Sequence, residues 1–285
     1  MTKLADIEAA LARSFTRENL AIFADALLAD GDLRGELVHI DLAADPALAA
    51  RRSEVEAEWL AYLPRPLVVT TKYGFIAAEI SGTAVTPLLE SPYYRAQIRH
   101  LIIDGPSNFD TAFYGLRHGP PMPFLWSLAC EAGSGAYNPL SHTPVLDEAT
   151  PNLHALSIHG RAKFLQFAHA NVRHLSIRGL GKMQNPAKLP RVTRFELRFE
   201  PFEYGIRTLD DAIRHFEMFH VPELEHLDLR GNTNPMFDAY SFADRLKLPD
   251  SLETITLPPR FADHHEAMLG RIRTRFPDVA VSEDE

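Results

Sequence analysis

The segment Val172-Arg-His-Leu175-Ser-Ile177 carries apolar residues at its first, fourth and sixth positions, and this spacing returns along much of the chain. The copies of the pattern are Ile98–Ile103, Leu153–Ile158, Val172–Ile177, Val192–Leu197, Leu224–Leu229 and Leu252–Leu257. A strand-like unit that recurs every roughly 20 to 30 residues is typical of a repeat protein, because no single unit can bury its own apolar residues. The pattern therefore predicts stacked units whose strands lie side by side in a parallel sheet.

Two weaker copies of the pattern lie outside this set. Phe75-x-x-Ala78-x-Ile80 follows a turn at Tyr73-Gly74 and is interpreted as the first, capping unit. Leu125-x-x-Leu128-x-Cys130 divides the longest gap between copies into two nearly equal parts. Because residues 105–144 are rich in Gly and Pro, this second segment is compatible with either a further repeat or an inserted loop. The sequence leaves the role of that insert open.

The regions before and after the repeats are predicted to be helical. Ile7, Leu11 and Phe15 recur at helical spacing, and Asp45-Pro46 has the residue types preferred at the start of a helix. We therefore expect a helical module over residues 1–66, the repeats over 67–261, and a C-terminal capping helix with an acidic tail over 262–285.

The N-terminal region also resembles a known family. Ala24-Asp-Ala-Leu27, then Gly31-Asp-Leu-Arg-Gly-Glu-Leu-Val38, and later Gly74-Phe-Ile76 are similar to the repeat-companion domain, a short helical module that precedes the repeats of many bacterial leucine-rich-repeat proteins. The resemblance implies an α/β fold: an irregular leucine-rich-repeat solenoid with a parallel sheet on its concave face and helices or loops on its convex face. It also implies a scaffold for protein interaction, and it assigns no substrate.

The chain departs from that family in the asparagine that usually follows each repeat strand. Only Asn232 keeps it, whereas the equivalent positions hold Pro106, Arg161, Leu180, Glu200 and Arg260. A continuous ladder of buried asparagines is therefore excluded, and we expect the coils to be irregular.

Residues that alternate with the apolar positions must face away from the core. In the third such column, just beyond the last apolar position, the predicted strands place His159, Arg178, Arg198 and Arg230 next to one another. The predicted partner-binding residues are therefore His159, Arg173, His174, Arg178, Arg194, Arg198, His226, Asp228 and Arg230. We expect them to dock an acidic surface of another protein. Alternatively, these arginines pair with Glu196, Asp228 and Glu225 in a solvated lattice of ion pairs.

Composition excludes several other classes. With 46% hydrophobic and 24% charged residues the 285-residue chain is an ordinary globular protein, and its net charge of −9 argues against nucleic-acid or acidic-membrane binding. The longest apolar runs are too short to cross a bilayer. The single cysteine, Cys130, cannot form an internal disulfide, so a cytoplasmic location is expected. The oligomeric state is left open.

The sequence predicts no catalytic residue, no cofactor and no metal ligand. Histidine pairs such as His169 and His174 are five residues apart, which suits neither one helix face nor one strand face. His264-His-Glu266 begins like a zinc-protease helix, but Leu269 replaces the second histidine of that motif. The leading hypothesis is thus a non-enzymatic protein-binding module. The alternatives are an accessory or immunity-type protein that neutralises or positions a cognate toxin or enzyme, and, less favoured, an enzyme.

Overall fold

The computed structural model describes residues 4–62, 68–81, 89–104, 116, 119–131, 137–138, 146–162, 168–180, 185–199, 208–232, 238–259 and 264–283. The predicted domain boundaries at residues 66 and 261 lie outside these ranges. So does most of the Gly/Pro-rich insert over residues 105–144.

The N-terminal residues form a helical module. Its elements are α1 (Leu4–Arg13), α2 (Arg17–Ala29), α3 (Arg34–Ala43), the 3-10 helix η1 (Pro46–Leu48), α4 (Ala49–Trp59) and the 3-10 helix η2 (Leu60–Tyr62). Thr16 caps α2 by accepting a hydrogen bond from the backbone N of Asn19, and Asp45 accepts one from the backbone N of Ala47. The cap predicted at Asp45 is therefore confirmed, although the single long helix expected after it is divided into η1, α4 and η2.

Helices α2 and α3 pack closely because Gly35 has no side chain. A Cβ at this position would lie 2.6 Å from the carbonyl oxygen of Ala24 and 2.8 Å from the Leu28 side chain. The neighbouring Arg34 is buried, and its guanidinium donates two hydrogen bonds to Asp32 Oδ2 at 2.9 and 2.6 Å. These two charge-assisted hydrogen bonds to one carboxylate oxygen pair the buried charge and fix the connection between the two helices.

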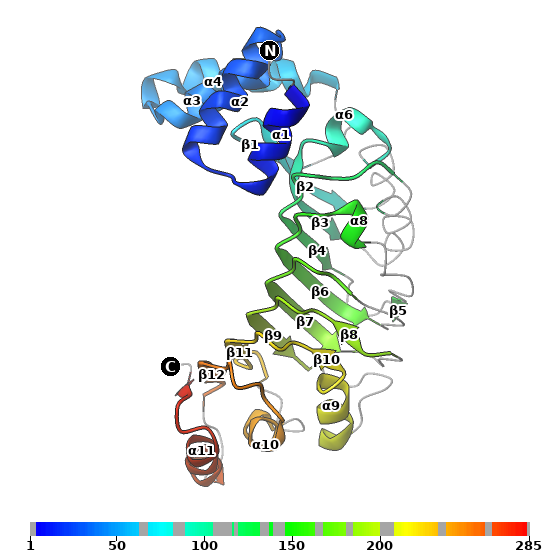
Figure 1. Ribbon diagram of the computed structural model, residues 1–285, viewed down its shortest axis with the longest axis vertical. Helices are drawn as coiled ribbons and strands as arrows, with labels where there is room; N and C mark the ends of the chain where they lie inside the picture. The colour runs from blue at the N-terminus through cyan, green and yellow to red at the C-terminus, as the bar shows by residue number, and fades with distance from the viewer. Residues whose placement is uncertain are drawn as a thin grey trace.

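A large, mostly parallel sheet follows the helical module (Figure 1). Along its path the strands are β1 (Val68–Lys72), β2 (Phe75–Ser81), β3 (Ile98–Asp104), β4 (Ser127–Glu131), β6 (Ala155–Ala162), β7 (His174–Leu180), β9 (Arg194–Arg198), β11 (His226–Asp228), β12 (Thr254–Leu257) and β13 (Ala280–Glu283). Strand β5 (Tyr137–Asn138) pairs with β6. Only the β1–β2 hairpin is antiparallel among the described pairs, and the strands lie in chain order. The protein is therefore of the mixed α/β class.

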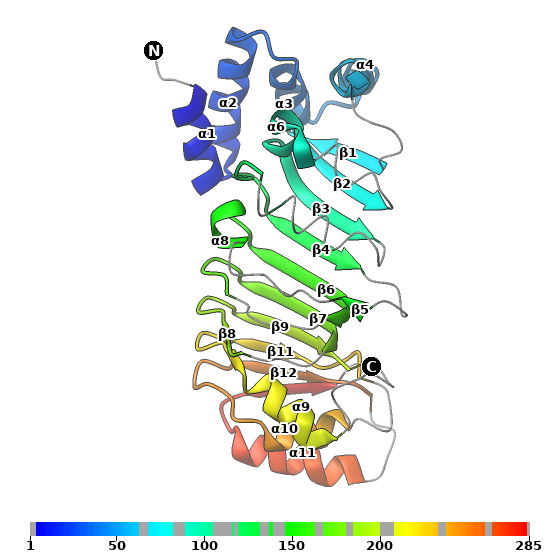
Figure 2. The ribbon, with the colours of Figure 1, turned by 90° about the vertical axis from the view of Figure 1, so that its right-hand side faces the viewer.

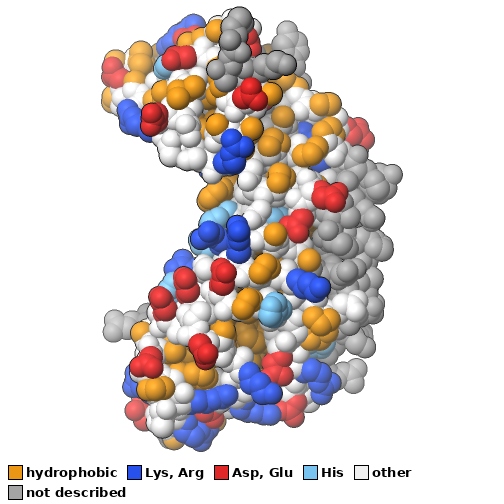
Figure 3. Space-filling view, in the orientation of Figure 1, with side chains coloured by type: hydrophobic (Ala, Val, Ile, Leu, Met, Phe, Trp, Pro, Cys, Tyr) orange, Lys and Arg blue, Asp and Glu red, His pale blue; other side chains and the backbone are white. Residues whose placement is uncertain are grey.

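The connecting helices lie on one side of this sheet (Figure 2). They are α6 (Pro92–Arg95), α8 (Leu146–Ala149), α9 (Leu209–Phe216), α10 (Ala239–Arg245) and α11 (His264–Arg275). A second sheet of β8 (Ala187–Lys188) and β10 (Phe219–His220) lies on the same side. The opposite face of the large sheet lines a hollow between the helical module and the C-terminal end (Figure 3).

The apolar positions of the repeated pattern form the core. Leu175 and Ile177 of β7 are 2% and 0% exposed, and the equivalent residues of the other copies are similarly buried. Each fully buried aliphatic side chain contributes roughly 1.5–3 kcal/mol, so the sheet is held mainly by these inward rows. Between the sheet and the helices, Phe195 stacks on Phe216 at 5.4 Å and contacts Phe219 edge-on at 5.1 Å.

The structure decides two points of the sequence analysis, the role of Leu125–Cys130 and the form of the C-terminal tail. Leu125, Leu128 and Cys130 are buried, and β4 is in register between β3 and β6, so the first of the two alternatives, a further repeat strand, is right. The expected acidic tail is wrong in part. Ala280–Glu283 pairs with β12 in parallel, so the sheet continues past the C-terminal helix.

Asn232 links two neighbouring strands from within the core. Its side chain is 1% exposed, and its Oδ1 accepts a hydrogen bond from the backbone N of Phe199 at 2.6 Å. Its Nδ2 donates to the carbonyl oxygens of Leu197 and Leu229 at 2.7 and 2.9 Å. The residue therefore satisfies backbone groups of both β9 and β11 that would otherwise be buried without partners.

Candidate functional site

The strand register brings the outward residues into columns across the open face of the sheet. The first column runs His100, Ser127, Ala155, His174, Arg194, His226 and Thr254, and the middle column runs Ile102, Ala129, Ser157, Ser176, Glu196, Asp228 and Thr256. These alignments confirm the predicted columns and add the β4 residues. Four of the predicted partner-binding residues, His174, Arg194, His226 and Asp228, therefore lie on this face.

The third column is only partly as predicted. His159 pairs in register with Arg178, and Arg178 with Arg198, but β11 ends at Asp228 and Arg230 lies in the turn that follows. The Arg198 side chain lies over Gly231, where a Cβ would overlap it. The continuous row predicted through Arg230 is thus interrupted at the end of β11.

The arginines of this third group are bound to carboxylates. Arg178 and Arg198 lie 3.7 and 3.2 Å from Glu196 Oε1, and Arg230 lies 2.6 Å from Asp228 Oδ2. All three side chains are more than a third exposed, so each pair stabilises the fold by little. For these residues the arrangement matches the alternative of a solvated ion-pair lattice.

A further column lies at the amino-terminal edge of the strands and was not predicted. We call it the edge column: Arg99, Trp126, His154, Arg173, Thr193, Glu225 and Glu253, each of which follows the first apolar residue of its repeat. Backbone hydrogen bonds join it, for instance from Trp126 N to Arg99 O at 2.8 Å and from Arg173 N to His154 O at 2.9 Å. Neighbouring members therefore stand side by side like residues within a sheet.

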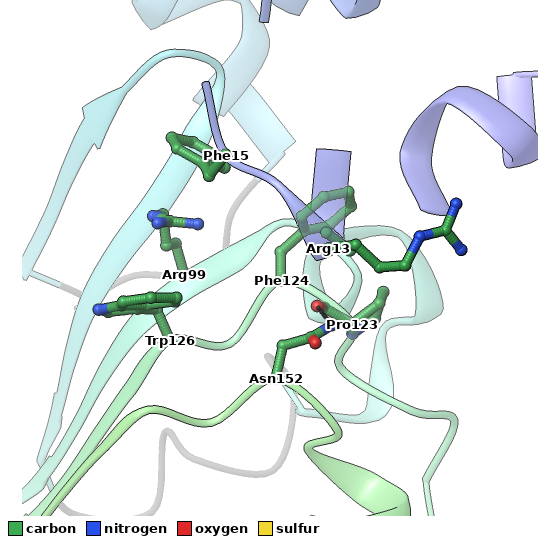
Figure 4. A pocket seen from close by; sticks show the side chains of 8 residues that line it. Arg13, Phe15, Arg99, Pro123, Phe124, Trp126 and Asn152 are labelled. Carbon is green, nitrogen blue, oxygen red and sulfur yellow. Dashed lines mark hydrogen bonds between the residues drawn. The ribbon is translucent and has the colours of Figure 1, made fainter. Parts of the chain in front are cut away.

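Three members of the edge column, Arg99, Trp126 and His154, stack with Phe15 of the helical module and His174 of the first column. We call these five residues the cation–aromatic ladder. The Arg99 guanidinium carbon lies 3.5 Å from the centre of the Phe15 ring and 5.2 Å from that of Trp126 (Figure 4). Trp126 stacks on His154 at 4.1 Å and 9°, and His154 contacts His174 edge-on at 5.0 Å. The ladder thus runs from the helical module onto the open face.

Arg99 is the most unusual charge of this ladder. Burial lowers the pKa of its guanidinium to about 10, because the aromatic rings around it replace part of its hydration. Within the described ranges, Arg99 has no carboxylate partner, and neither do Arg13, Arg173 and Arg194. These four cations are therefore available to an anionic group from outside the chain.

The histidines of the ladder are held in their neutral form by the same surroundings. The pKa of His154 is lowered by burial and then by His174 and Arg173. The pKa of His174 is lowered by burial and then by Arg194, Arg173 and His226. At neutral pH both rings therefore act as flat stacking surfaces with one donor and one acceptor nitrogen each.

A pocket of about 290 Å³ opens beside the ladder, at the junction of the helical module and the sheet (Figure 4). It is lined by Ala12, Arg13, Phe15, Arg99, Pro123, Phe124, Trp126 and Asn152. A pocket with apolar walls and two guanidinium groups suits a ligand in which a small apolar side chain lies next to a carboxylate.

The charge on this surface changes sign along the sheet. Arg99 and Arg173 lie in the part of the edge column toward the N-terminus, whereas Glu225 and Glu253 lie toward the C-terminus. Figure 3 shows basic and histidine side chains in the middle of the hollow and acidic ones beyond them on the C-terminal side. A partner with the opposite polarity would therefore be oriented along the hollow.

The sequence analysis found part of this site. It named Arg173, His174 and Arg194, but it missed Arg13, Phe15, Arg99 and Trp126. The signal for the edge column was present, because the position after each first apolar residue changes from basic or aromatic to acidic along the repeats. The contribution of Phe15 had no such signal, since it comes from a segment far away in the sequence.

Cys130 is fully buried, and burial raises the pKa of its thiol, so it is a structural residue and a poor nucleophile. None of the described helices combines the length and the apolar character that a bilayer-crossing segment requires.

Comparison with known proteins gives no family for this chain. No family model matches it, and no curated protein sequence matches it.

Proposed function

We propose that this chain is a cytoplasmic, non-enzymatic protein-binding module that holds an acidic segment of a partner protein against the cation–aromatic ladder. It would belong to the leucine-rich-repeat class, with a repeat-companion domain before the solenoid. Support for this class comes from the recurring strand pattern, the parallel strands in chain order and the buried bridge at Asn232.

The observation that carries the proposal is the group Arg13, Arg99, Arg173 and Arg194, which have no carboxylate partners among the described residues. Cations without counter-ions repel one another, and among these four only Arg99 has a stabilising side-chain contact within the described ranges, with the Phe15 and Trp126 rings. A carboxylate-bearing partner would convert this repulsion into charge-assisted hydrogen bonds. Trp126, a residue type common among interface hot spots, would supply the apolar contact beside them.

The partner segment that fits best carries acidic residues next to one apolar residue. The apolar side chain would occupy the pocket next to Phe124, and its acidic neighbours would reach Arg13 and Arg99. The remaining carboxylates would follow the open face to Arg173 and Arg194.

The test compares two charge-matched variants of the full chain in affinity capture from cells of the source organism. The first variant reverses the unpaired cations Arg13, Arg173 and Arg194 to Glu, and the second reverses the paired cations Arg178, Arg198 and Arg230 to Glu. Arg99 is left unchanged because it is largely buried between rings, where a carboxylate would disturb folding. Urea unfolding of both variants controls for their stability.

We expect the first variant to bind the captured partner at least about tenfold more weakly, a loss of roughly 1.4 kcal/mol. The second variant should retain most of the affinity, because its arginines are already engaged by Glu196 and Asp228. Equal affinity of both variants and the wild type would refute binding at the ladder. Loss in the second variant alone would move the site to the third column.

A further inference from the structure

Three side chains with metal-ligating atoms meet at the C-terminal end of the protein: Asp238, His264 and His265. Their potential ligand atoms all lie within 4.8 Å of one another. Nε2 of His265 is 3.3 Å from Asp238 Oδ1, and Nε2 of His264 is 3.7 Å from Asp238 Oδ2. Two ligands bound tetrahedrally at about 2.0–2.1 Å from one ion are themselves about 3.3 Å apart, so the spacing suits a shared ion.

The two imidazoles converge on Asp238 although they come from consecutive residues of one helix. His264 and His265 are the first residues of α11, and consecutive residues of a helix point about 100° apart. Both rings nevertheless face one carboxylate, which comes from the residue that precedes α10. The site therefore depends on how α10 and α11 pack, which explains why no spacing within α11 revealed it.

The carboxylate is held in place and keeps room for a ligand. Asp238 Oδ1 accepts a hydrogen bond from the backbone N of Tyr240 at 3.0 Å, and Oδ2 accepts one from Ser241 Oγ. Each carboxylate oxygen has two lone-pair directions, so one on each oxygen remains toward the histidines. Hydrogen bonds of this kind orient the carboxylate that binds a metal ion and are typical of metal sites.

One of the two histidines is buried and the other is exposed, so an ion from solvent could reach the site. His265 is fully buried, and its ring stacks on Tyr240 at 4.2 Å and 13°. The His264 side chain is 59% exposed, and its ring contacts that of His265 at 4.6 Å. One ligand is thus fixed by packing, and the other leaves an approach from solvent.

We propose that Asp238, His264 and His265 bind a divalent transition-metal ion, with zinc(II) as the best fit. Two imidazole nitrogens and one carboxylate oxygen are borderline ligands that suit zinc, whereas calcium and magnesium prefer oxygen ligands alone. The ion would join α10 to α11 and hold the last helix against the end of the sheet. Zinc binding at this site is independent of partner binding at the ladder.

The test uses the full chain, purified without a histidine tag and treated with a chelator. Zinc chloride is titrated by calorimetry into the wild type, His264→Ala and Asp238→Asn. The first substitution removes an exposed ligand, and the second replaces the carboxylate by an amide that still caps α10. His220→Ala removes an exposed histidine far from this cluster in the sequence and serves as the matched control. Cobalt(II) absorption reports the coordination geometry.

The expected result is one zinc ion per chain, with affinity at least about tenfold weaker in His264→Ala and Asp238→Asn and unchanged in His220→Ala. Cobalt(II) should give the visible absorption of a tetrahedral site in the wild type, and both substitutions should remove it. Absence of saturable binding would overturn the proposal, as would equal binding by all four proteins. In either case Asp238 forms only an ordinary ion pair with the histidines.

Discussion

The guanidinium carbon of Arg99 lies 3.5 Å from the centre of the Phe15 ring, so a cation on strand β3 rests against the segment that joins α1 to α2. Phe15 also meets Phe75 edge-on at 5.5 Å. One aromatic ring therefore connects the helical module both to the core of the sheet and to the cation–aromatic ladder. This contact is one of several that join the module to the sheet, together with the stacking of Phe23 on Phe75 at 5.7 Å.

Phe15→Leu tests how much this contact stabilises the fold. The substitution keeps an apolar side chain but removes the ring face under Arg99 and the edge contact to Phe75. A partly desolvated cation–π contact contributes about 0.5–2 kcal/mol and an aromatic pair about 0.5–1.5 kcal/mol. We therefore expect the free energy of unfolding in urea to fall by about 1–3 kcal/mol.

Tyr93→Leu is the control for this substitution. Tyr93 is 48% exposed; its ring contacts that of Tyr94 edge-on at 5.1 Å and lies 5.8 Å from the Arg34 guanidinium carbon. Because these contacts are exposed to solvent, the control should cost less than Phe15→Leu, at most about 1 kcal/mol. If the two variants lose equal stability, the Phe15–Arg99 contact does not hold the module in the way described.

The sequence predicts best those strands whose pattern of apolar residues repeats along the chain. Each inward row, such as Leu175 and Ile177, repeats in sequence because each unit must bury the same positions against the next. That repetition also predicted the register of His174 with Arg194. Strand β13 escaped prediction because it lies at the edge of the sheet and its residues are only partly buried, so it carries no apolar pattern.

The site was less predictable because its parts come from different elements. The sequence predicts that Arg178 and Arg198 lie side by side and gives pairing with Glu196 as one of two alternatives. Only the distances of 3.7 and 3.2 Å to Glu196 decide in favour of that pairing. The sequence pattern assigns no role to Trp126. Its role becomes visible only when His154 and Arg99 lie on either side of it.

Gly35→Ala tests the close packing of α2 against α3. The added methyl group would lie 2.6 Å from the Ala24 carbonyl oxygen, so the helices must separate. Overpacking of this kind costs about 1–3 kcal/mol. We expect the midpoint of urea unfolding to fall accordingly.

Gly270→Ala is the matched control, because Gly270 lies within α11 and nothing approaches its Cβ position within 4 Å. Alanine is the better helix former, so this variant should gain about 0.5–1 kcal/mol. A Gly35→Ala protein as stable as the wild type would contradict the close contact between the two helices.

The ladder histidines should make stability depend on pH. Burial is the main reason that the pKa values of His154 and His174 lie below the ordinary 6.5 in the folded chain. A histidine with a lowered pKa binds a proton more readily in the unfolded state. Its contribution to stability is therefore complete above about pH 6.5 and is lost as the pH falls below that value toward the folded pKa.

The double substitution His154→Gln with His174→Gln removes two of these groups. We expect the free energy of unfolding to fall less between about pH 7 and about pH 5 than in the wild type. Some dependence should remain, because burial also lowers the pKa values of His100, His159 and His169. The measurement is urea unfolding at several pH values.

Any difference between the two proteins above pH 7 reports packing alone, since the histidines are neutral there in both states. An unchanged slope at acidic pH would show that the ladder rings are hydrated like free imidazoles, and the stacking of Trp126 on His154 would then need revision.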